Sequence, residues 1–296
     1  MSKETKYGLR ELQEQFPNDR VCLEYLFESL HTEECSCGGT YTPLFKLNTK
    51  GKIVGRKQFQ CSKCRFQIAP MAGTIFEKST SPLKLWFHAI WIFSNAKSGI
   101  SAKEIERQLN VTYKTAWRFL KLIRESLAQS DAKLKNDVEI DEGFFGGKGD
   151  GGANNSKLSQ AMGKKAKVIA AIERGGKMKA KRVPDVSAKT IGKFLDENVQ
   201  KENTRLLTDE SNRYNTVAEG YNRQSVNHGK KEYVRADIHV NNVEGFWGHV
   251  KRSIKGTHKA VSKKHLQSYL DGFVFHYDNR GNDKERFVSL ISVIVR

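Results

Sequence analysis

Apolar residues recur every three to four positions in two stretches of the chain, with a different pattern between them. Residues 7–31 show this helical spacing on both sides of a break at Pro17, and residues 82–128 show it again. Residues 33–70 instead carry glycine, cysteine, threonine and lysine around short alternating fragments, which is typical of small β-hairpins. We therefore predict three consecutive modules: a helical lead-in over 1–32, a β-rich module over 33–70 and a helical region over 71–130.

Two capping signals divide the end of the helical region into a pair of helices. Ser101 precedes AKEIERQL, Asn110 breaks the pattern, and Thr112 precedes a longer helix that runs to Leu127. This rhythm is typical of a helix-turn-helix, whose second helix enters the major groove of DNA. A generic three-helix packing unit is the alternative. In a helix-turn-helix, the DNA contacts would come from the start of the second helix, at Tyr113, Lys114, Thr115 and Arg118.

From residue 131 to the end at 296, the pattern changes to alternating strands and helices. VEID is a strand candidate that ends at Asp141. Lys167–Glu173 and Lys179–Val183 flank a Gly-Gly turn, as in a hairpin. A helix capped by Ser187 and a short strand at Arg205–Thr208 follow. Residues 131–296 are thus predicted to form one α/β domain.

Two helices close this predicted domain. Asn241 or Asn242 caps the first, and Gly256 ends it as the residue after the C-cap. The second spans Val261–Tyr277. Within the same domain, Gly146–Ser156 is rich in glycine, asparagine, lysine and aspartate, and we predict a mobile loop there.

The chain is strongly basic. It has 51 lysine and arginine residues against 33 acidic ones, a formal net charge of +18. With 38% hydrophobic residues in 296 it can also bury a sizeable core, so a soluble protein that meets a polyanion, most often nucleic acid, is expected. No apolar run approaches the roughly 18 residues of a membrane span, and the N-terminus lacks the apolar core of a signal peptide. We expect a cytoplasmic protein with no membrane partner.

Four of the five cysteines form two pairs, separated by 23 residues of hairpin-like sequence. Two such pairs on two β-turns can place four thiolates around a structural Zn²⁺. CSKC has the usual C-x-x-C spacing, whereas the first pair is one residue shorter, so His31 stays open as a ligand. Ordinary free thiols are the alternative to a zinc site. The predicted zinc ligands are Cys35, Cys37, Cys61 and Cys64.

Three acidic residues stand in this basic chain at Asp141, Asp209 and Glu244, with 34 residues between the second and the third. Phosphoryl transfer on DNA uses two Mg²⁺ (or Mn²⁺) ions about 4 Å apart, and carboxylates hold such hard cations. We predict that these acids form that two-metal site. The alternatives are Glu139 or Glu142 in place of Asp141, Glu210 in place of Asp209, and Asn241 in place of Glu244.

A basic stretch follows the third acid. Lys251 lies seven residues after Glu244, about two helical turns, so both project from one face and the lysine could hold a phosphate near the metals. No acid occurs from Gly245 to Leu270, and basic side chains beside aromatic ones suit a DNA track. Trp247 in the same stretch is expected in the core. The DNA contacts predicted after Lys251 are Arg252, Lys255, Lys263 and Lys264.

Several motifs together resemble one known family. The stretches that carry the resemblance are GTIFEKSTSPLKLWF, VEIDEGFFGGK, LLTDESNRY and the long segment from EYVRADIHVNNVEGFWGHVKR to DGFVFHYDNR. The chain is similar to the transposases of the IS1595 family of bacterial insertion sequences, which have an ISXO2-like transposase domain of the DDE type. The resemblance implies an RNase H-like catalytic domain preceded by a zinc ribbon and a helix-turn-helix. It also implies Asp141, Asp209 and Glu244 as the catalytic acids and Lys251 as the basic residue after the third.

The resemblance implies a DNA transposase that cuts at the ends of its element and joins the freed 3′-OH to target DNA. Its partners would be the terminal inverted repeats, target DNA and a second copy of the chain, and it would associate with the bacterial nucleoid. Two alternatives stay open: a DNA-binding regulator derived from a transposase, and an RNase H-like nuclease that cuts without joining.

Overall fold

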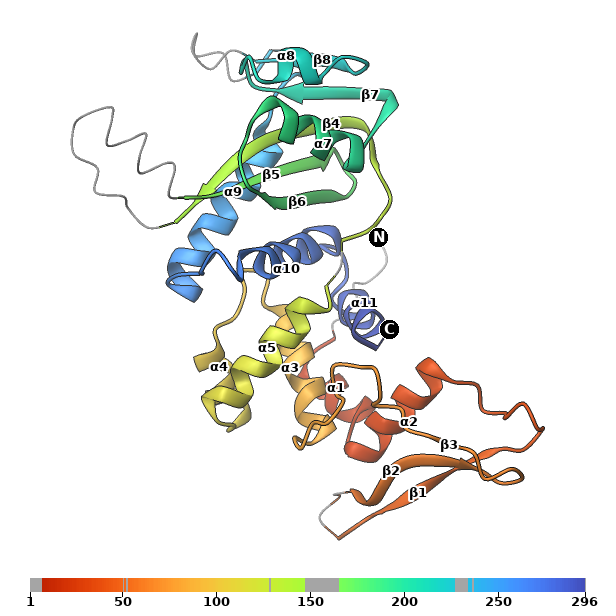
Figure 1. Ribbon diagram of the computed structural model, residues 1–296. Coiled ribbons are helices and arrows are strands. Elements are labelled where there is room, and N and C mark those ends of the chain that lie inside the picture. Colours follow the sequence, from red (N-terminus) through yellow and green to blue (C-terminus); the bar gives the residue numbers. More distant parts are fainter. Residues whose placement is uncertain are drawn as a thin grey trace. The chain divides into compact units, whose positions relative to one another are not determined.

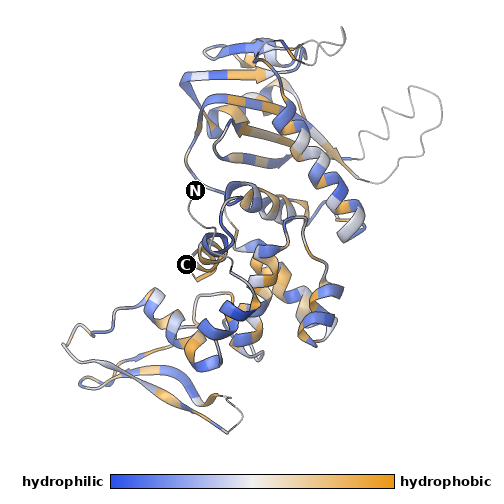
Figure 2. Cartoon of the chain, turned by 180° about the vertical axis from the view of Figure 1, so that it is seen from behind, coloured by the Kyte–Doolittle hydropathy of each residue, from blue (hydrophilic) through white to orange (hydrophobic). Residues whose placement is uncertain are grey.

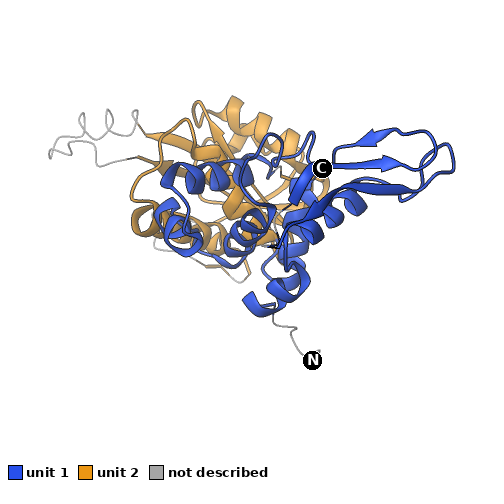
Figure 3. Ribbon diagram, turned by 90° about the horizontal axis from the view of Figure 1, so that it is seen from below, with its two compact units in different colours: residues 1–127, 279–296 blue, residues 128–278 orange. Residues whose placement is uncertain are grey.

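The protein is described from a computed structural model that covers residues 7–49, 51, 53–127, 129–146, 165–226, 234–235 and 237–295. The chain divides into two compact units (Figure 3). Unit 1 contains residues 1–127 and 279–296, and unit 2 contains residues 128–278. Most of the loop predicted to be mobile, over 147–156, lies outside the described residues.

Unit 1 is built on helices that pack through aromatic side chains. Phe16 follows α1, and its ring lies 4.6 Å from that of Phe87 on α3, while Trp86 on α3 lies 4.1 Å from Phe119 on α5. Arg286 on α11 is almost fully buried and donates to the carbonyl of Ser94 at the end of α3. The helices of this core are α1 (Leu9–Gln15), α2 (Asp19–Leu30), α3 (Leu83–Asn95) and α11 (Asp283–Val295).

The last helix differs from the sequence-based expectation. Residues 283–295 lie in the range predicted as the catalytic domain, yet α11 packs against α3 and α2 of unit 1. Its apolar face, with Phe287, Leu290 and Ile291, is buried there. A cap signal was available and was not used, because Asn282 precedes the helix and its side chain accepts from the backbone N–H of Lys284 at 2.8 Å.

A small antiparallel sheet carries the cysteines of unit 1. Its strands run in the order β1 (Tyr41–Leu47), β2 (Ile53–Cys61) and β3 (Gln67–Ile68). Phe59 on β2 stacks on Phe27 of α2 at 4.2 Å, which anchors this sheet to the helices. The small β-structure predicted over 33–70 is therefore present.

The predicted pair of capped helices is also present in unit 1. They are α4 (Ala102–Leu109) and α5 (Tyr113–Glu125). The side chain of Ser101 accepts from the backbone N–H of Glu104, and that of Thr112 accepts from Thr115. Asn110 ends α4 in the left-handed conformation, with φ 49°, a conformation that asparagine tolerates better than most residues.

Unit 2 is organised around a mixed five-stranded sheet in the order β6-β5-β4-β7-β8 (Figure 1). β5 is antiparallel to both β4 and β6, whereas β7 is parallel to β4 and to β8. The predicted hairpin is confirmed, with Gly175 at φ 72° in its turn. The strands are β4 (Leu134–Phe145), β5 (Ala166–Glu173), β6 (Met178–Val183), β7 (Val199–Thr208) and β8 (Asn222–Ser225).

Helices cover both faces of this sheet. Successive side chains of a strand point to opposite faces, and along β5 Val168 packs with α9 and α10 while Ile169 packs with α7 and α8. In Figure 2 orange, hydrophobic segments alternate with blue ones along the strands of this sheet. The covering helices are α7 (Ala188–Asn198), α8 (Tyr214–Val217), α9 (Asn241–Ser253) and α10 (Leu266–Asp278).

Helix α9 departs from its prediction at both ends. Asn241 and Asn242 are its first residues and neither is the N-cap, which is Val240 and offers no side-chain acceptor. Gly256 does not end the helix, because a π-helical turn, Ile254–His258, continues it to Lys259, which has φ 62°. The next helix, α10, begins at Leu266, five residues later than predicted. In the described part of the chain we find no helix with the length and apolar character that a membrane crossing requires.

Candidate active site and metal centre

Asp141 and Asp209 are brought together by the parallel pairing of β4 and β7. The register sets Glu139 opposite Leu207, and two residues further along it leads to Asp141 on one strand and Asp209 just past the other. The prediction that Asp141 ends its strand is wrong, because β4 continues to Phe145, paired with Ala166 of β5. Asp209 does follow its strand directly, as predicted.

Asp141 lies on the face of β4 that α9 covers. Its Oδ2 accepts a hydrogen bond of 3.1 Å from the indole N–H of Trp247. Burial, and then the charges of Asp209 and Glu244, raise the pKa of Asp141 to about 6. Asp209 and Glu244 are therefore close enough for their charges to act on Asp141, as expected for a shared cation site.

Trp247 is 4% exposed, which confirms the expectation that it lies in the core. Its hydrogen bond to Asp141 was not anticipated. The ring lies against Gly143, where an added Cβ would stand 3.1 Å from two indole atoms. The glycine therefore leaves room for the indole to reach the carboxylate two residues earlier in β4.

Arg223 on β8 holds the turn that carries Asp209. The Arg223 guanidinium donates to the backbone carbonyls of Asp209 and Ser211, at 3.2 and 3.5 Å, and to the hydroxyl oxygen of Thr208 at 3.0 Å. Asp209 Oδ1 also accepts from the backbone N–H of Ser211, at 3.0 Å. One oxygen of Asp209 is thus engaged in the turn itself.

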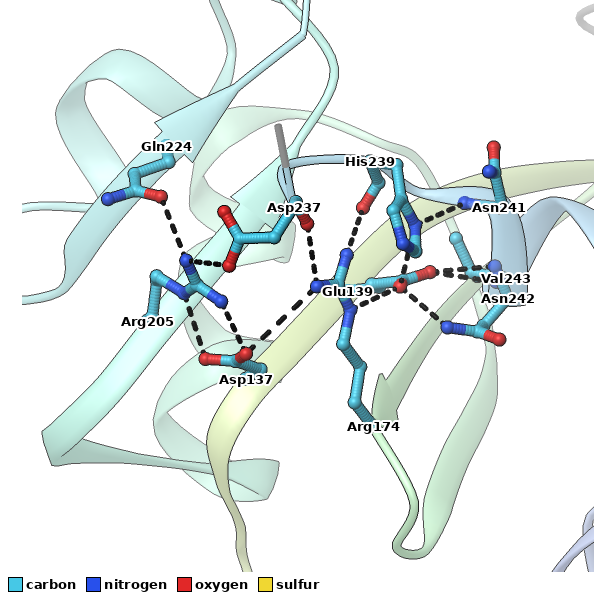
Figure 4. Close-up of polar contacts among 10 residues, drawn as sticks. All are labelled: Asp137, Glu139, Arg174, Arg205, Gln224, Asp237, His239, Asn241, Asn242 and Val243. Carbon is cyan, nitrogen blue, oxygen red and sulfur yellow. Dashed lines mark hydrogen bonds and ion pairs between the residues drawn. The ribbon is translucent and has the colours of Figure 1, made fainter. Parts of the chain in front are cut away.

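Glu244 lies in the first turn of α9, one helical turn before Trp247, and is exposed beside the buried face of the helix. A buried network fixes this first turn (Figure 4). Glu139 of β4 is 0% exposed and accepts from the backbone N–H groups of Asn242 and Val243, at 2.8 and 3.3 Å. Arg174 donates to the same carboxylate at 2.8 Å.

The two acids considered in place of Asp141 have other partners. Glu139 is occupied by the donors just described. Glu142 points to the opposite face of β4, where the buried Tyr214 hydroxyl donates to it at 2.8 Å. Burial raises the pKa of Glu142. The hydrogen bond from Tyr214 opposes this rise, and the charges of Asp141 and Asp209 add to it. In the described part of the chain, the carboxylate oxygens of Asp141, Asp209 and Glu244 do not all lie within 4.8 Å of one another.

Exposed basic side chains line the surface after Glu244. Lys251 and Arg252 are exposed near the end of α9, and Lys255 follows in the π-helical turn. Lys263 and Lys264 are exposed in the segment before α10. The positive side chains predicted to contact DNA are therefore all available at the surface.

The exposed side of α5 carries the four residues predicted to contact DNA and one that was missed. Tyr113, Lys114 and Arg118 are exposed and Thr115 is half-buried. Trp117 is 42% exposed, and the ammonium of Lys121 lies 5.5 Å from its ring. An exposed tryptophan is unusual in a folded domain. The sequence signal was available, because Trp117 stands four residues after Tyr113 on the same face.

The four paired cysteines form a tight cluster in unit 1. Their sulfur atoms all lie within 4.8 Å of one another, with Cys37 and Cys61 3.4 Å apart and Cys35 and Cys64 3.6 Å apart. Tetrahedral ligation at Zn–S bonds of about 2.3 Å places sulfurs about 3.8 Å apart. The shorter first pair thus meets the second, and the cluster could hold a metal ion without His31.

Backbone N–H groups in the two loops favour the thiolate form of Cys35 and Cys61. The backbone N–H of Cys37 is the main influence that lowers the pKa of Cys35 to about 6, and that of Cys64 lowers the pKa of Cys61. A Cβ on Gly39 would stand 2.6 Å from the Cys61 sulfur, so only glycine allows this approach. Thiolates are the form that binds metal.

The chain is similar to proteins of transposable elements. Residues 133–278 match the family described as the ISXO2-like transposase domain. The chain is 26% identical over 251 residues to the "Uncharacterized protein in transposable element ISH50" of Halobacterium salinarum. The matched region covers 79% of this chain and 84% of the relative. A solved structure, "Crystal structure of a pre-cleavage Mos1 transpososome", is 12% identical with a TM-score of 0.29 over 70% of this chain and 75% of that one, too low to carry an argument. Residues 133–278 thus form an ISXO2-like transposase domain of the IS1595 family.

Proposed function

We propose that this transposase binds the ends of its insertion sequence and catalyses metal-dependent DNA cleavage and strand transfer with Asp141, Asp209 and Glu244. The observation that carries the proposal is the crowding of charge at Asp141, whose pKa is raised to about 6 by burial and then by the other two acids. Such crowding is costly in a folded protein unless a cation relieves it.

The donor set fits a hard divalent cation. Three carboxylates offer only oxygen, which suits Mg²⁺ or Mn²⁺ better than Zn²⁺. Two such ions, when bound, supply the charge that activates one oxygen and stabilises the leaving oxygen at a phosphodiester. The chain's own part is to aim the carboxylates: Trp247 orients Asp141, and Arg223 holds the turn of Asp209. Lys251, about two turns after Glu244 on α9, is placed to hold a phosphate.

The topology of unit 2 supports an RNase H-like domain. Three antiparallel strands followed outward by two parallel ones, in the order β6-β5-β4-β7-β8, match that fold. Asp141 lies on β4, which is the first strand of this sheet along the chain. Asp209 directly follows β7, and Glu244 lies on α9. This is how an RNase H-like fold gathers three carboxylates.

The DNA contacts proposed for the front of the chain lie on α5, within a helix-turn-helix formed with α4. Lys114 and Arg118 are exposed one turn apart and suit phosphate contacts, while Tyr113 and Trp117 offer apolar surface to base edges. In unit 2, the exposed cations at Lys251, Arg252, Lys255, Lys263 and Lys264 form the proposed track for the DNA backbone.

We propose Zn²⁺ as the occupant of the cysteine cluster. Four sulfur ligands at these separations fit tetrahedral zinc, and the small sheet around them has little core beyond Phe45 and Phe59. Metal binding would therefore contribute folding energy to this ribbon.

A strand-transfer assay tests the chemistry. With a duplex that ends in the terminal repeat and a free 3′-OH, Asp141→Asn and Asp209→Asn should abolish Mg²⁺-dependent joining while leaving repeat binding intact. Asp137→Asn is the matched control, because this acid on the same strand is paired with Arg205 and should leave joining intact. Joining by either of the first two variants would refute the assignment. Cleavage without joining by the wild type would favour a nuclease, and binding alone would favour a regulator.

A homodimer is proposed because two element ends must be held for concerted transfer. Light scattering of the complex with repeat duplexes checks it, and a single chain per two ends would contradict it.

A further inference from the structure

We propose that Glu139 and Arg174 are positioning residues of the active site: as a buried pair, they set the first turn of α9 and thereby the place of Glu244. The inference rests on the proposed function for its catalytic meaning, whereas its structural part stands on the contacts in Figure 4.

From its own chain segment the start of α9 has a side-chain acceptor in His239 Nδ1, which lies 3.4 Å from the backbone N of Asn241. The N-cap Val240 has no side-chain acceptor, yet the first N–H groups of a helix need one. Glu139 supplies it from β4: its Oε2 accepts from the backbone N–H of Asn242 and of Val243, at 2.8 and 3.3 Å. A carboxylate at this end of a helix is also favoured by the helix dipole.

The second oxygen of Glu139 is occupied as well. Its Oε1 accepts from the Asn242 side-chain amide at 2.7 Å and from Arg174 Nε at 2.8 Å, and His239 Nδ1 lies 3.3 Å away. A carboxylate has about four lone-pair sites, so these contacts saturate it. Glu139 therefore has no oxygen left for a cation, although only one residue separates it from Asp141.

Arg174 also binds the segment that leads into α9. Besides Glu139, its guanidinium donates to the backbone carbonyls of Asp237 and His239, at 2.7 and 3.0 Å. Its own backbone N–H donates to the carbonyl of Asp137 on β4 at 2.9 Å. One side chain thus joins the end of β5, strand β4 and the approach to α9.

The consequence for the site follows from spacing. Asp141 is two residues after Glu139 on the same face of β4, and Glu244 is two residues after Asn242 on α9. The contact between Glu139 and Asn242 therefore sets how far the carboxylate of the helix lies from that of the strand. If the first turn of α9 shifts, Glu244 moves relative to Asp141.

The test compares Glu139→Gln with Glu197→Gln by two measurements: amide hydrogen exchange of residues 240–250, and calorimetric binding of Mn²⁺ alone. The glutamine amide would turn an N–H group toward donors of α9, so exchange there should accelerate and Mn²⁺ affinity should fall about 10- to 100-fold, as for other residues that orient metal ligands. Glu197→Gln makes the same change at an exposed acid of α7, on the opposite face of the sheet, where it pairs with Lys181, and should alter neither.

Unchanged exchange in Glu139→Gln would overturn the proposal. Weaker Mn²⁺ binding with unchanged exchange would also overturn it, because Glu139 would then act as a ligand. Asn242→Ala, a change at an exposed residue that removes one donor to Glu139, provides the same comparison with a smaller expected effect if Glu139→Gln does not fold. If wild type and Asp141→Asn bind Mn²⁺ equally, the proposed metal site fails, and the exchange data still decide the role of Glu139.

Discussion

Replacing Asp141 by asparagine should make the metal-free protein more stable at neutral pH while abolishing its activity. Burial, and then the charges of Asp209 and Glu244, raise the pKa of Asp141 from 3.8 to about 6. At about 1.36 kcal/mol per pH unit, this rise corresponds to about 3 kcal/mol. It is an upper bound, because the half-buried carboxylate keeps some contact with solvent.

The sign of the effect follows from which state holds the proton. Between pH 3.8 and about 6, the folded wild type binds the Asp141 proton more tightly than the unfolded chain does. The stability of the wild type therefore falls as pH rises through this window, and the loss is complete above it. Asparagine carries no charge and its Oδ1 can still accept from Trp247, so Asp141→Asn should match the wild type near pH 4 and exceed it at pH 7.

Urea unfolding between pH 4 and 8 without divalent ions measures this difference. Asp137→Asn is the control with the opposite sign: the hydrogen bond from Arg205 lowers the pKa of Asp137, so its removal should destabilise the protein at pH 7. Added Mn²⁺ at about 100 times its dissociation constant should stabilise the wild type by about 2.7 kcal/mol and Asp141→Asn much less. Equal stability of wild type and Asp141→Asn across this pH range would refute the charge-crowding argument.

Three further changes test other parts of the molecule. Gly143→Ala places a Cβ 3.1 Å from the Trp247 ring, so urea unfolding should show a loss of about 1–3 kcal/mol; an unchanged midpoint would mean that the ring has room to move. Trp117→Ala should leave stability within about 1 kcal/mol but weaken binding of a terminal-repeat duplex about 30-fold in fluorescence anisotropy, the loss of about 2 kcal/mol typical of a tryptophan at an interface. Equal affinity would exclude this side chain from the DNA surface. Cys61→Ser should remove stoichiometric zinc in elemental analysis, and a protein that folds equally well without metal would contradict a structural zinc site.

The parts of the fold that the sequence predicted are those with local signals. Ser101 and Thr112 cap their helices as expected because the capping hydrogen bond spans only three residues. The hairpin of β5 and β6 was recognisable from its glycine turn. The cysteine quartet followed from spacing, although only the structure shows that the shorter first pair reaches the second.

The parts that the sequence did not predict depend on residues far apart in the chain. Asn241 and Asn242 resemble N-caps, yet the cap of α9 is Glu139, 103 residues before Asn242. Gly256 resembles a helix end, but the helix passes through it as a π-helical turn. Asp141 resembles a strand end because the glycine-containing sequence after it breaks the local pattern, and pairing with β5 carries the strand on to Phe145. At the start of α9 and along β4, contacts with distant residues thus outweigh the local preference.

The strongest argument for a cation at the acids comes from comparing Glu139 with Asp141. Both lie on the same face of β4 under α9, so the strand and the covering helix are shared. Glu139 is matched by the Arg174 guanidinium and the helix N-terminus. Asp141 accepts a hydrogen bond from the neutral indole of Trp247, and the charges of Asp209 and Glu244 raise its pKa. One fold thus neutralises a carboxylate with its own cation and, two residues away, gathers three acids in a chain of net charge +18. A site that binds an external cation explains this difference, whereas a purely structural role for the three acids does not.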